Sequence, residues 1–252
     1  MDVVTPSEPD SRTGPRRDTG VYRGSRQATS PLYTSLDRLG GTEPPHTKAG
    51  LEEHILRSFI RYSRPHLDRA RTHDDWELLI TAQHHGVPTR LLDWTYSPLV
   101  AAFFATRPAD PGENDDRAVW RLDWQALHRT YGLPTLALLI QDLESLFGAS
   151  HLTPAKLFAA RDVKPFACMI EPPALDARIA AQAATFTLTS STKVSFEKFL
   201  AEQQLEHALT RYVIPASNVA KFRDQLDMVG IDERRLFPDL DGVAAAIQRY
   251  YA

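Results

Sequence analysis

Cysteine is nearly absent from the chain, with Cys168 alone among 252 residues. A single thiol cannot form a disulfide within the chain, so a disulfide-stabilised fold is excluded. It suits a reducing compartment, and we predict a cytoplasmic location. Long apolar runs are missing too. The longest clean run, Leu99 to Ala105, is far shorter than a membrane-spanning helix, which needs about 20 residues, so we expect no membrane association.

The chain has no excess of basic charge. It has 29 Lys and Arg against 32 Asp and Glu, a formal net charge of −3. Broad electrostatic attraction to nucleic acid is therefore not indicated, although a local basic groove stays open. Residues 1–18 contain no apolar stretch of the kind a secretory signal needs. Their polar, Pro-containing composition predicts a disordered tail, with a cloning remnant as the alternative.

Motifs of several common enzyme classes are also missing. The chain has no Walker loop, no Gly-x-Gly-x-x-Gly after a strand, no Gly-x-Ser-x-Gly elbow, no His-Glu-x-x-His and no kinase motifs. Its nine histidines show no metal-ligand spacing. The adjacent His84 and His85 point to different sides of a helix, so we expect no metal site.

What the sequence does contain is a series of short strands separated irregularly by helices. Strands are predicted at 21–23, 90–93, 118–124, 167–171, 185–189 and 207–214. Helices are predicted at 51–62, 76–84, 99–105, 135–147, 195–203, 217–229 and 240–250, and a short helix or a turn at 176–183. Ser97-Pro98 would start the third of these helices, Ser217 would cap the helix that runs to residue 229, and Gly230 would follow its end. The segment 25–50, rich in Pro, Gly, Ser and Thr, is predicted to be a long loop. Because regular βαβ units are missing, we predict an α+β fold. It would be a single domain, residues 19–252, with mixed or antiparallel short-stranded sheets flanked by helices.

Polar side chains are concentrated between Ala82 and Thr95, which read Ala-Gln-His-His-Gly-Val-Pro-Thr-Arg-Leu-Leu-Asp-Trp-Thr. A helix that ends at the Gly-x-Pro break and continues as a short strand would gather these groups at one rim. We interpret the segment as part of a binding site. His84 can donate to a ligand hydroxyl or transfer a proton, although a histidine at a helix end is often only a cap.

Arginines recur beside the other predicted site segments. Arg23 lies at a strand end beside Gly24, where it can pair with phosphate while the glycine lets a ligand approach the backbone; the alternative is a surface arginine before a turn. Arg90 and Asp93 are three residues apart on a strand and therefore point to opposite faces. Asp93 can bind a ligand or serve as a turn residue. Gln182 is one helical turn after an arginine, on a face that can contact a ligand or solvent.

These motifs resemble the FRG-domain family, named for a Phe-Arg-Gly-type signature near its start. The matching residues are Tyr22-Arg23-Gly24, the segment Gln83 to Thr95, Ser97-Pro98-Leu99, Arg178-Ile179 with Gln182 and Phe186, Val213-Ile214-Pro215, and Leu236 to Gly242. The resemblance spans Gly20 to Ile247. Tyr22 replaces Phe, His85 stands where an aromatic residue is expected, and Pro108 to Asp116 matches no block.

The order of these blocks is also similar to that of ADP-ribosyltransferases, including toxins that modify DNA. This resemblance implies an ADP-ribosyltransferase-like fold with NAD as the substrate. The residues implied to bind NAD are Tyr22, Arg23, Gly24, His84, Thr89 and Arg90. The residues implied to act in catalysis are Arg23, His84, Asp93 and Gln182.

The late catalytic position departs from that family. A glutamate there orients the nicotinamide ribose and stabilises an oxocarbenium-like transition state, whereas this chain has Gln182, which supplies no negative charge. Losing such stabilisation costs on the order of a hundredfold in rate or more. Either Asp93 or Glu171 supplies the charge, or the protein binds a nucleotide without this chemistry.

Two functions follow as expectations. The first is an NAD-dependent ADP-ribosyltransferase or NAD glycohydrolase that acts as a bacterial toxin or antiphage effector, with a nucleic acid or protein acceptor and an antitoxin as a further partner. The second is a non-catalytic module that senses a nucleotide or a phage component. A plain nucleic-acid binder is disfavoured by the acidic charge balance.

Overall fold

The computed structural model describes residues 19–40, 43, 46–66, 75–107, 114–146, 165–173, 177–190 and 194–251. The tail predicted at residues 1–18 lies outside the described residues. So does the last residue of the helix predicted at 135–147.

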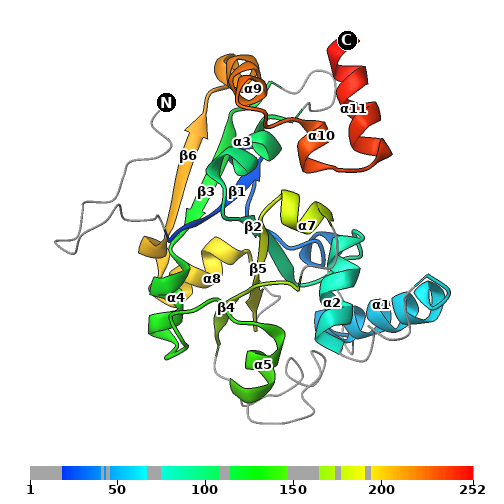
Figure 1. The fold of residues 1–252 in the computed structure, drawn as a ribbon. Coiled ribbons are helices and arrows are strands. Elements are labelled where there is room, and N and C mark those ends of the chain that lie inside the picture. The colour runs from blue at the N-terminus through cyan, green and yellow to red at the C-terminus, as the bar shows by residue number, and fades with distance from the viewer. Residues whose placement is uncertain are drawn as a thin grey trace.

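One six-stranded sheet crosses the described part of the molecule (Figure 1). Its strands are β1 (Val21–Ser25), β2 (Leu91–Thr95), β3 (Arg117–Leu122), β4 (Ala167–Ile170), β5 (Ala184–Thr189) and β6 (Leu209–Ile214). They lie in the order β4-β5-β2-β1-β3-β6, and each neighbouring pair is antiparallel. The predicted α+β class with short strands is therefore confirmed.

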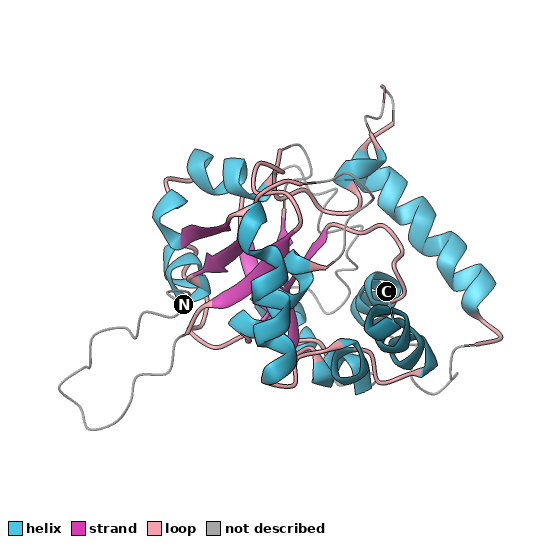
Figure 2. Cartoon of the chain, turned by 90° about the horizontal axis from the view of Figure 1, so that it is seen from above, coloured by secondary structure: helices cyan, strands magenta, loops and turns pink. Residues whose placement is uncertain are grey.

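Helices pack on both faces of this sheet, as Figure 2 shows from above. They are α1 (Lys48–Ser63), α2 (Asp75–His84), α3 (Pro98–Thr106), α4 (Trp124–Thr130), α5 (Ile140–Leu146), α7 (Ala177–Ala181), α8 (Phe196–Glu202), α9 (Val219–Met228), α10 (Glu233–Leu236) and α11 (Leu240–Tyr251). Side chains alternate along each strand, so α4 and α8 cover one face while α3 and α9 cover the other at β1 and β3. α1, α2 and α5 cover that second face at β4 and β5.

Capping residues explain where several helices begin. Ser97 accepts a hydrogen bond from the Val100 amide at 3.3 Å, so α3 begins with the predicted Ser-Pro pair. The strand predicted to reach residue 124 ends at Leu122, because Asp123 caps α4 by accepting from the Ala126 amide. The prediction that Ser217 caps α9 is wrong, since a 3-10 turn occupies that position and α9 begins two residues later.

The two central strands barely pair with each other. β1 and β2 share one register pair, Tyr22 with Thr95, whereas β1 pairs with β3 along its whole length and β2 does the same with β5. Beyond that single pair, β1 and β2 diverge. The centre of the sheet is therefore split, and the split lies between the helices that cover its two halves.

Candidate functional site

Arg23 spans the split between β1 and β2. Its Nη1 donates to the main-chain carbonyl of Asp93 at 2.7 Å and lies 3.4 Å from the Asp93 carboxylate. A side chain therefore replaces the ladder hydrogen bond that is missing where the strands diverge. Burial lowers the pKa of Arg23, and the Asp93 carboxylate opposes that shift.

A chain of hydrogen bonds fixes the Asp93 carboxylate on its other side. The Gln83 amide nitrogen donates to Asp93 Oδ1 at 2.8 Å, and Gln83 Oε1 accepts from the Thr89 hydroxyl at 2.6 Å. Thr89 Oγ1 in turn accepts from the Leu91 amide. The carboxylate is thus held by Arg23 and Gln83, while 54% of the Asp93 side chain stays exposed.

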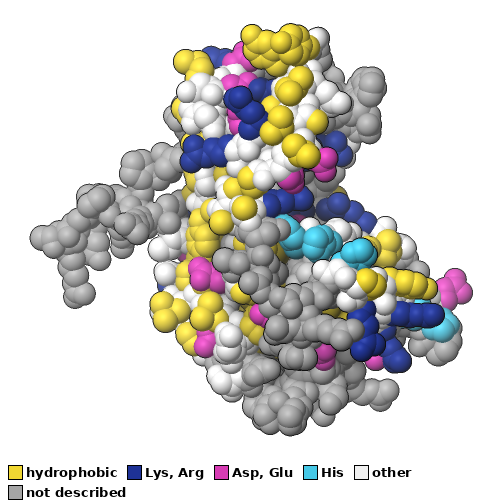
Figure 3. All heavy atoms as spheres, turned by 45° about the vertical axis from the view of Figure 1, so that its right-hand side comes forward, with side chains coloured by type: hydrophobic (Ala, Val, Ile, Leu, Met, Phe, Trp, Pro, Cys, Tyr) yellow, Lys and Arg dark blue, Asp and Glu magenta, His cyan; other side chains and the backbone are white. Residues whose placement is uncertain are grey.

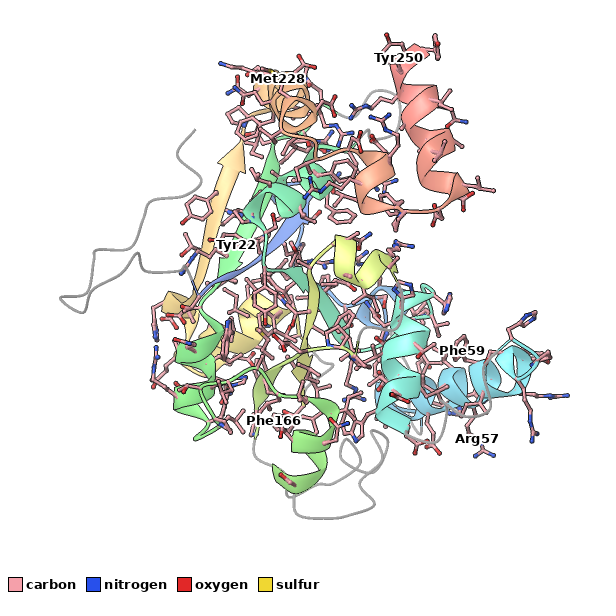
Figure 4. All side chains as sticks on the ribbon, in the orientation of Figure 1. Tyr22, Arg57, Phe59, Phe166, Met228 and Tyr250 are labelled. Atoms are coloured by element: carbon pink, nitrogen blue, oxygen red, sulfur yellow. The ribbon has the colours of Figure 1, made fainter. Side chains whose placement is uncertain are left out.

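A cleft of about 990 Å³ opens over the split. It is lined by Tyr22, Arg23, Gly24, Ser25, Arg26, Gln27, Ser30, Pro31, Leu32, Tyr33, Ser35, Arg38, Gln83, His84, Gly86, Val87, Asp93, Trp94, Thr95, Ala101, Phe104, Arg107, Arg178, Ile179, Gln182, Ala184 and Phe186. Figure 4 shows Tyr22, one of these residues, on β1 in the middle of the molecule. The volume lies at the upper end of the range for small-molecule sites.

The lining of this cleft is strongly cationic although the chain as a whole is acidic. Its charged members are Arg23, Arg26, Arg38, Arg107 and Arg178, together with the single carboxylate of Asp93. Lys and Arg side chains gather beside histidines on the face in Figure 3. A cleft lined by one sign of charge concentrates ions of the other sign, so this cleft favours an anionic ligand.

The structure brings together all four residues predicted to act in catalysis. Arg23, His84, Asp93 and Gln182 line the one cleft, although they come from β1, α2, β2 and the turn after α7. Tyr22 and Gly24, predicted to bind the ligand, also line it. Thr89 does not, because it is fully buried and acts through Gln83.

Arg90 is the clearest departure from the predicted ligand contacts. Its side chain is 1% exposed, and its Nε donates to Glu52 Oε2 at 2.6 Å; the Arg90 main-chain amide donates to Glu52 Oε1. Burial lowers the pKa of Arg90, and the Glu52 carboxylate opposes that shift. Arg90 therefore joins α1 to the start of β2 and does not face the cleft. A lone arginine in the sequence gives no sign of a buried partner 38 residues away.

Gly24 was predicted to let a ligand approach the backbone, but in the structure it is α3 that approaches this glycine. A Cβ at this position would lie 2.1 Å from the Ala101 carbonyl oxygen and 2.5 Å from the Ala105 amide nitrogen. The glycine therefore allows α3 to lie directly against β1. Its first role is close packing of helix and strand, and β1 continues through it to Ser25.

Gln182 is held by two neighbouring elements. Its side-chain amide donates to the Leu236 carbonyl of α10 at 3.0 Å, and its main-chain carbonyl accepts from the Thr95 hydroxyl. Glu171, the other carboxylate considered for catalysis, does not line the cleft and accepts a 2.6 Å hydrogen bond from the Tyr96 hydroxyl. Among the described residues, Asp93 is the one carboxylate that lines the cleft.

Sequence reasoning missed three of the arginines that line the cleft. Arg26 and Arg38 belong to a segment that read only as a Pro- and Gly-rich loop, and Arg107 directly follows α3. A guanidinium at a helix C-terminus also complements the helix dipole, so Arg107 alone carries no functional signal in the sequence. Only the folded chain brings these cations together.

Metal-ligand clusters and membrane-spanning helices are both absent from the described part of the chain. No group of three or more His, Cys, Asp or Glu side chains there is placed to hold a metal ion. Among the same residues, no helix has both the length and the hydropathy to cross a bilayer.

Comparison with known proteins returns one family. Residues 18–114 match the family model described as the FRG domain. That range contains the Tyr-Arg-Gly and Gln83–Thr95 segments, whereas the later blocks lie beyond it and their assignment stays a prediction. No curated protein and no solved structure matches the chain. The chain is therefore similar to FRG-domain proteins over residues 18–114.

Proposed function

We propose that the cleft binds NAD and that the protein cleaves its nicotinamide–ribose bond. The observation that carries this proposal is the cleft's charge: among the described residues, five arginines and the carboxylate of Asp93 line it. Arginines provide the paired donors that phosphate oxygens accept, and so fit the pyrophosphate of a dinucleotide. The Asp93 carboxylate fits the positive charge that develops on the ribose when nicotinamide leaves.

The proposed reaction balances without a further reactant. Water, or a nucleophile on an acceptor, attacks C1′ of the nicotinamide ribose while the bond from C1′ to the pyridinium nitrogen breaks. The bonding electrons stay on that nitrogen, which makes nicotinamide neutral, and the nucleophile releases one proton to solvent. With water the product is ADP-ribose. With a nucleic acid or protein acceptor the product is an ADP-ribosylated molecule, the activity expected of a toxin or antiphage effector in the cytoplasm.

The contacts that Asp93 and Gln182 already make favour a second function. Both Asp93 oxygens already accept hydrogen bonds, and the Gln182 amide is neutral and bound to Leu236. These contacts reduce the negative charge available to a transition state. They fit a module that binds a nucleotide, or a nucleotide-bearing phage component, and signals its presence without turnover.

One pair of measurements separates these functions. Purified protein is incubated with NAD labelled in the nicotinamide, with and without protein, DNA and RNA acceptors, and release of the label is followed. Calorimetric titration of NAD measures binding in parallel. Release by wild type that is lost in Arg23→Ala supports catalysis, and binding without release supports the sensor. Neither binding nor release would overturn both.

A further inference from the structure

Phe237, which follows α10, carries two guanidinium groups on its ring. Arg107, after α3, lies with its Cζ 5.2 Å from the ring centroid, and Arg178, on α7, lies 4.8 Å from it. The two guanidinium carbons are therefore no more than 10.0 Å apart. Both arginines line the cleft. Three elements far apart in sequence thus place two like charges at one wall.

Neighbouring rings and main-chain contacts hold the Phe237 ring in place. Phe103 and Phe104 of α3 contact it at centroid distances of 6.4 and 6.2 Å. Gln182 fixes the preceding carbonyl, that of Leu236. A Cβ at Gly242 would lie 1.9 Å from the Phe237 carbonyl oxygen, so α11 begins directly against this residue. Helices α3, α10 and α11, together with the turn after α7, all fix one platform.

The two cations have no anionic partner within the described residues. No carboxylate there lies within ion-pair distance of Arg107 or Arg178, and neither side chain donates a hydrogen bond. Cation–π contact uses the flat face of a guanidinium and leaves the N–H donors at its edge available. Two neighbouring guanidinium groups that repel each other and keep their donors available fit a hydrogen-bond acceptor that carries two negative charges.

We propose that Arg107 and Arg178 on Phe237 form a phosphate-binding site of the cleft, separate from the Arg23–Asp93 pair. The proposal rests on the proposed function only in sharing its cleft, and it names the group that this wall recognises. The phosphate belongs either to the dinucleotide itself or to a second, acceptor molecule such as a single-stranded nucleic acid.

Calorimetric titration with inorganic pyrophosphate tests the site without assuming a natural ligand. Wild type is compared with the double variant Arg107→Gln and Arg178→Gln. The matched control is Lys198→Gln with Lys221→Gln, which removes two exposed charges outside the cleft. We expect the cleft variant to bind pyrophosphate about tenfold or more weakly, and the control to bind as wild type does. Equal affinities in the two double variants would overturn the site.

Two further variants guard against simple misfolding. Arg107→Lys with Arg178→Lys keeps both charges but lacks the flat guanidinium groups, so we expect it to bind pyrophosphate more weakly than wild type and more tightly than the glutamine variant. Phe237→Leu keeps an apolar side chain but removes the platform and is expected to weaken binding. Unfolding curves confirm that each variant is folded. Pyrophosphate binding that survives Phe237→Leu unchanged would argue against the platform.

Two further titrations of the glutamine double variant, one with NAD and one with a short single-stranded DNA, identify the molecule that carries the phosphate. Weaker binding of NAD, with a short single-stranded DNA unaffected, assigns the site to the dinucleotide, and the reverse result assigns it to an acceptor. If wild type releases no nicotinamide, the proposed catalysis fails, while the pyrophosphate comparison still decides this site. Unchanged affinity of the variant for all three probes refutes the proposal.

Discussion

At the scale of single residues, the Arg23–Asp93 and Arg90–Glu52 ion pairs differ in their exposure to solvent and therefore in their roles. Asp93 with Arg23 faces the cleft and remains half exposed, whereas Glu52 with Arg90 is almost wholly buried. An exposed charge pair contributes little to stability and is available to a ligand, while breaking a buried pair leaves an uncompensated charge. Removing either acid should therefore have distinct effects on stability and on function.

Replacing Glu52 by Gln should destabilise the fold without altering the cleft. The change removes the buried carboxylate that contacts Arg90, and we expect a loss of about 3–5 kcal/mol in the free energy of unfolding. Urea unfolding measures it. The matched control is Glu53→Gln, an exposed neighbour on the same helix, which should change stability by less than about 0.5 kcal/mol. Equal losses in both variants would contradict the structural role of the pair.

Replacing Asp93 by Asn should affect turnover more than binding. Asparagine keeps an oxygen for Arg23 or Gln83 but removes the negative charge. If the protein cleaves NAD, we expect the rate of nicotinamide release to fall by about a hundredfold, with NAD affinity changed by much less. Single-turnover rates and calorimetric titration measure the two quantities. A variant with the wild-type rate would remove Asp93 from catalysis.

At the scale of elements, close approach of helix and strand shapes the cleft wall. α3 lies so near β1 that Gly24 has no room for a methyl group. The same helix positions Phe104, which lines the cleft, and ends at Thr106, directly before Arg107. A change in the packing of α3 on β1 would therefore displace part of the ligand site as well as part of the core.

Gly24→Ala should be destabilising by about 1–3 kcal/mol, because the new methyl group must push the α3 backbone away from β1. Gly50→Ala, inside α1, is the control, since the new Cβ would lie at an ordinary contact distance of 3.4 Å from Thr47 Oγ1. That change should stabilise the protein by about 0.5–1 kcal/mol, as alanine favours helix. Thermal unfolding compares the two; a neutral Gly24→Ala would show that α3 can shift freely.

His128 links α4 to the sheet in a way that depends on its neutral form. Its Nδ1 donates to the Pro134 carbonyl at 2.6 Å, and its Nε2 accepts from the Met169 amide of β4. Burial lowers the pKa of His128, so the unfolded chain takes up this proton more readily than the folded one. Stability from this group is present above the ordinary pKa of about 6.5 and is lost as pH falls toward the lower folded value.

Urea unfolding at about pH 7.5 and about pH 5 tests this dependence. His128→Gln should be less stable than wild type at the higher pH, because it loses at least one buried hydrogen bond, and should lose less stability on acidification. His46→Gln, at an exposed position, should keep the wild-type pH dependence. If acidification destabilises His128→Gln as much as wild type, another group is responsible.

At the scale of the whole molecule, local patterns predicted more than long-range pairing. The limits of α3 and the Gly230 that ends α9 follow from caps and a left-handed glycine, which are written within a few neighbouring residues. The convergence of Arg23 and Asp93 depended on a recognised family pattern. The partner of Arg90 and the cations around Phe237 depended on contacts between distant segments, for which a single sequence holds no periodic signal.

The single rung between Tyr22 and Thr95 makes the sheet two three-stranded leaves joined at a narrow hinge. Arg23 and Asp93 lie on opposite leaves, so a bound guest molecule that contacts both residues would link the two leaves. Amide hydrogens of β1 and β2 should then exchange more slowly when the guest is present, whereas those of β4 should not respond. Ligand binding would then be measurable as increased rigidity of the sheet, even if the protein does not react with the bound molecule.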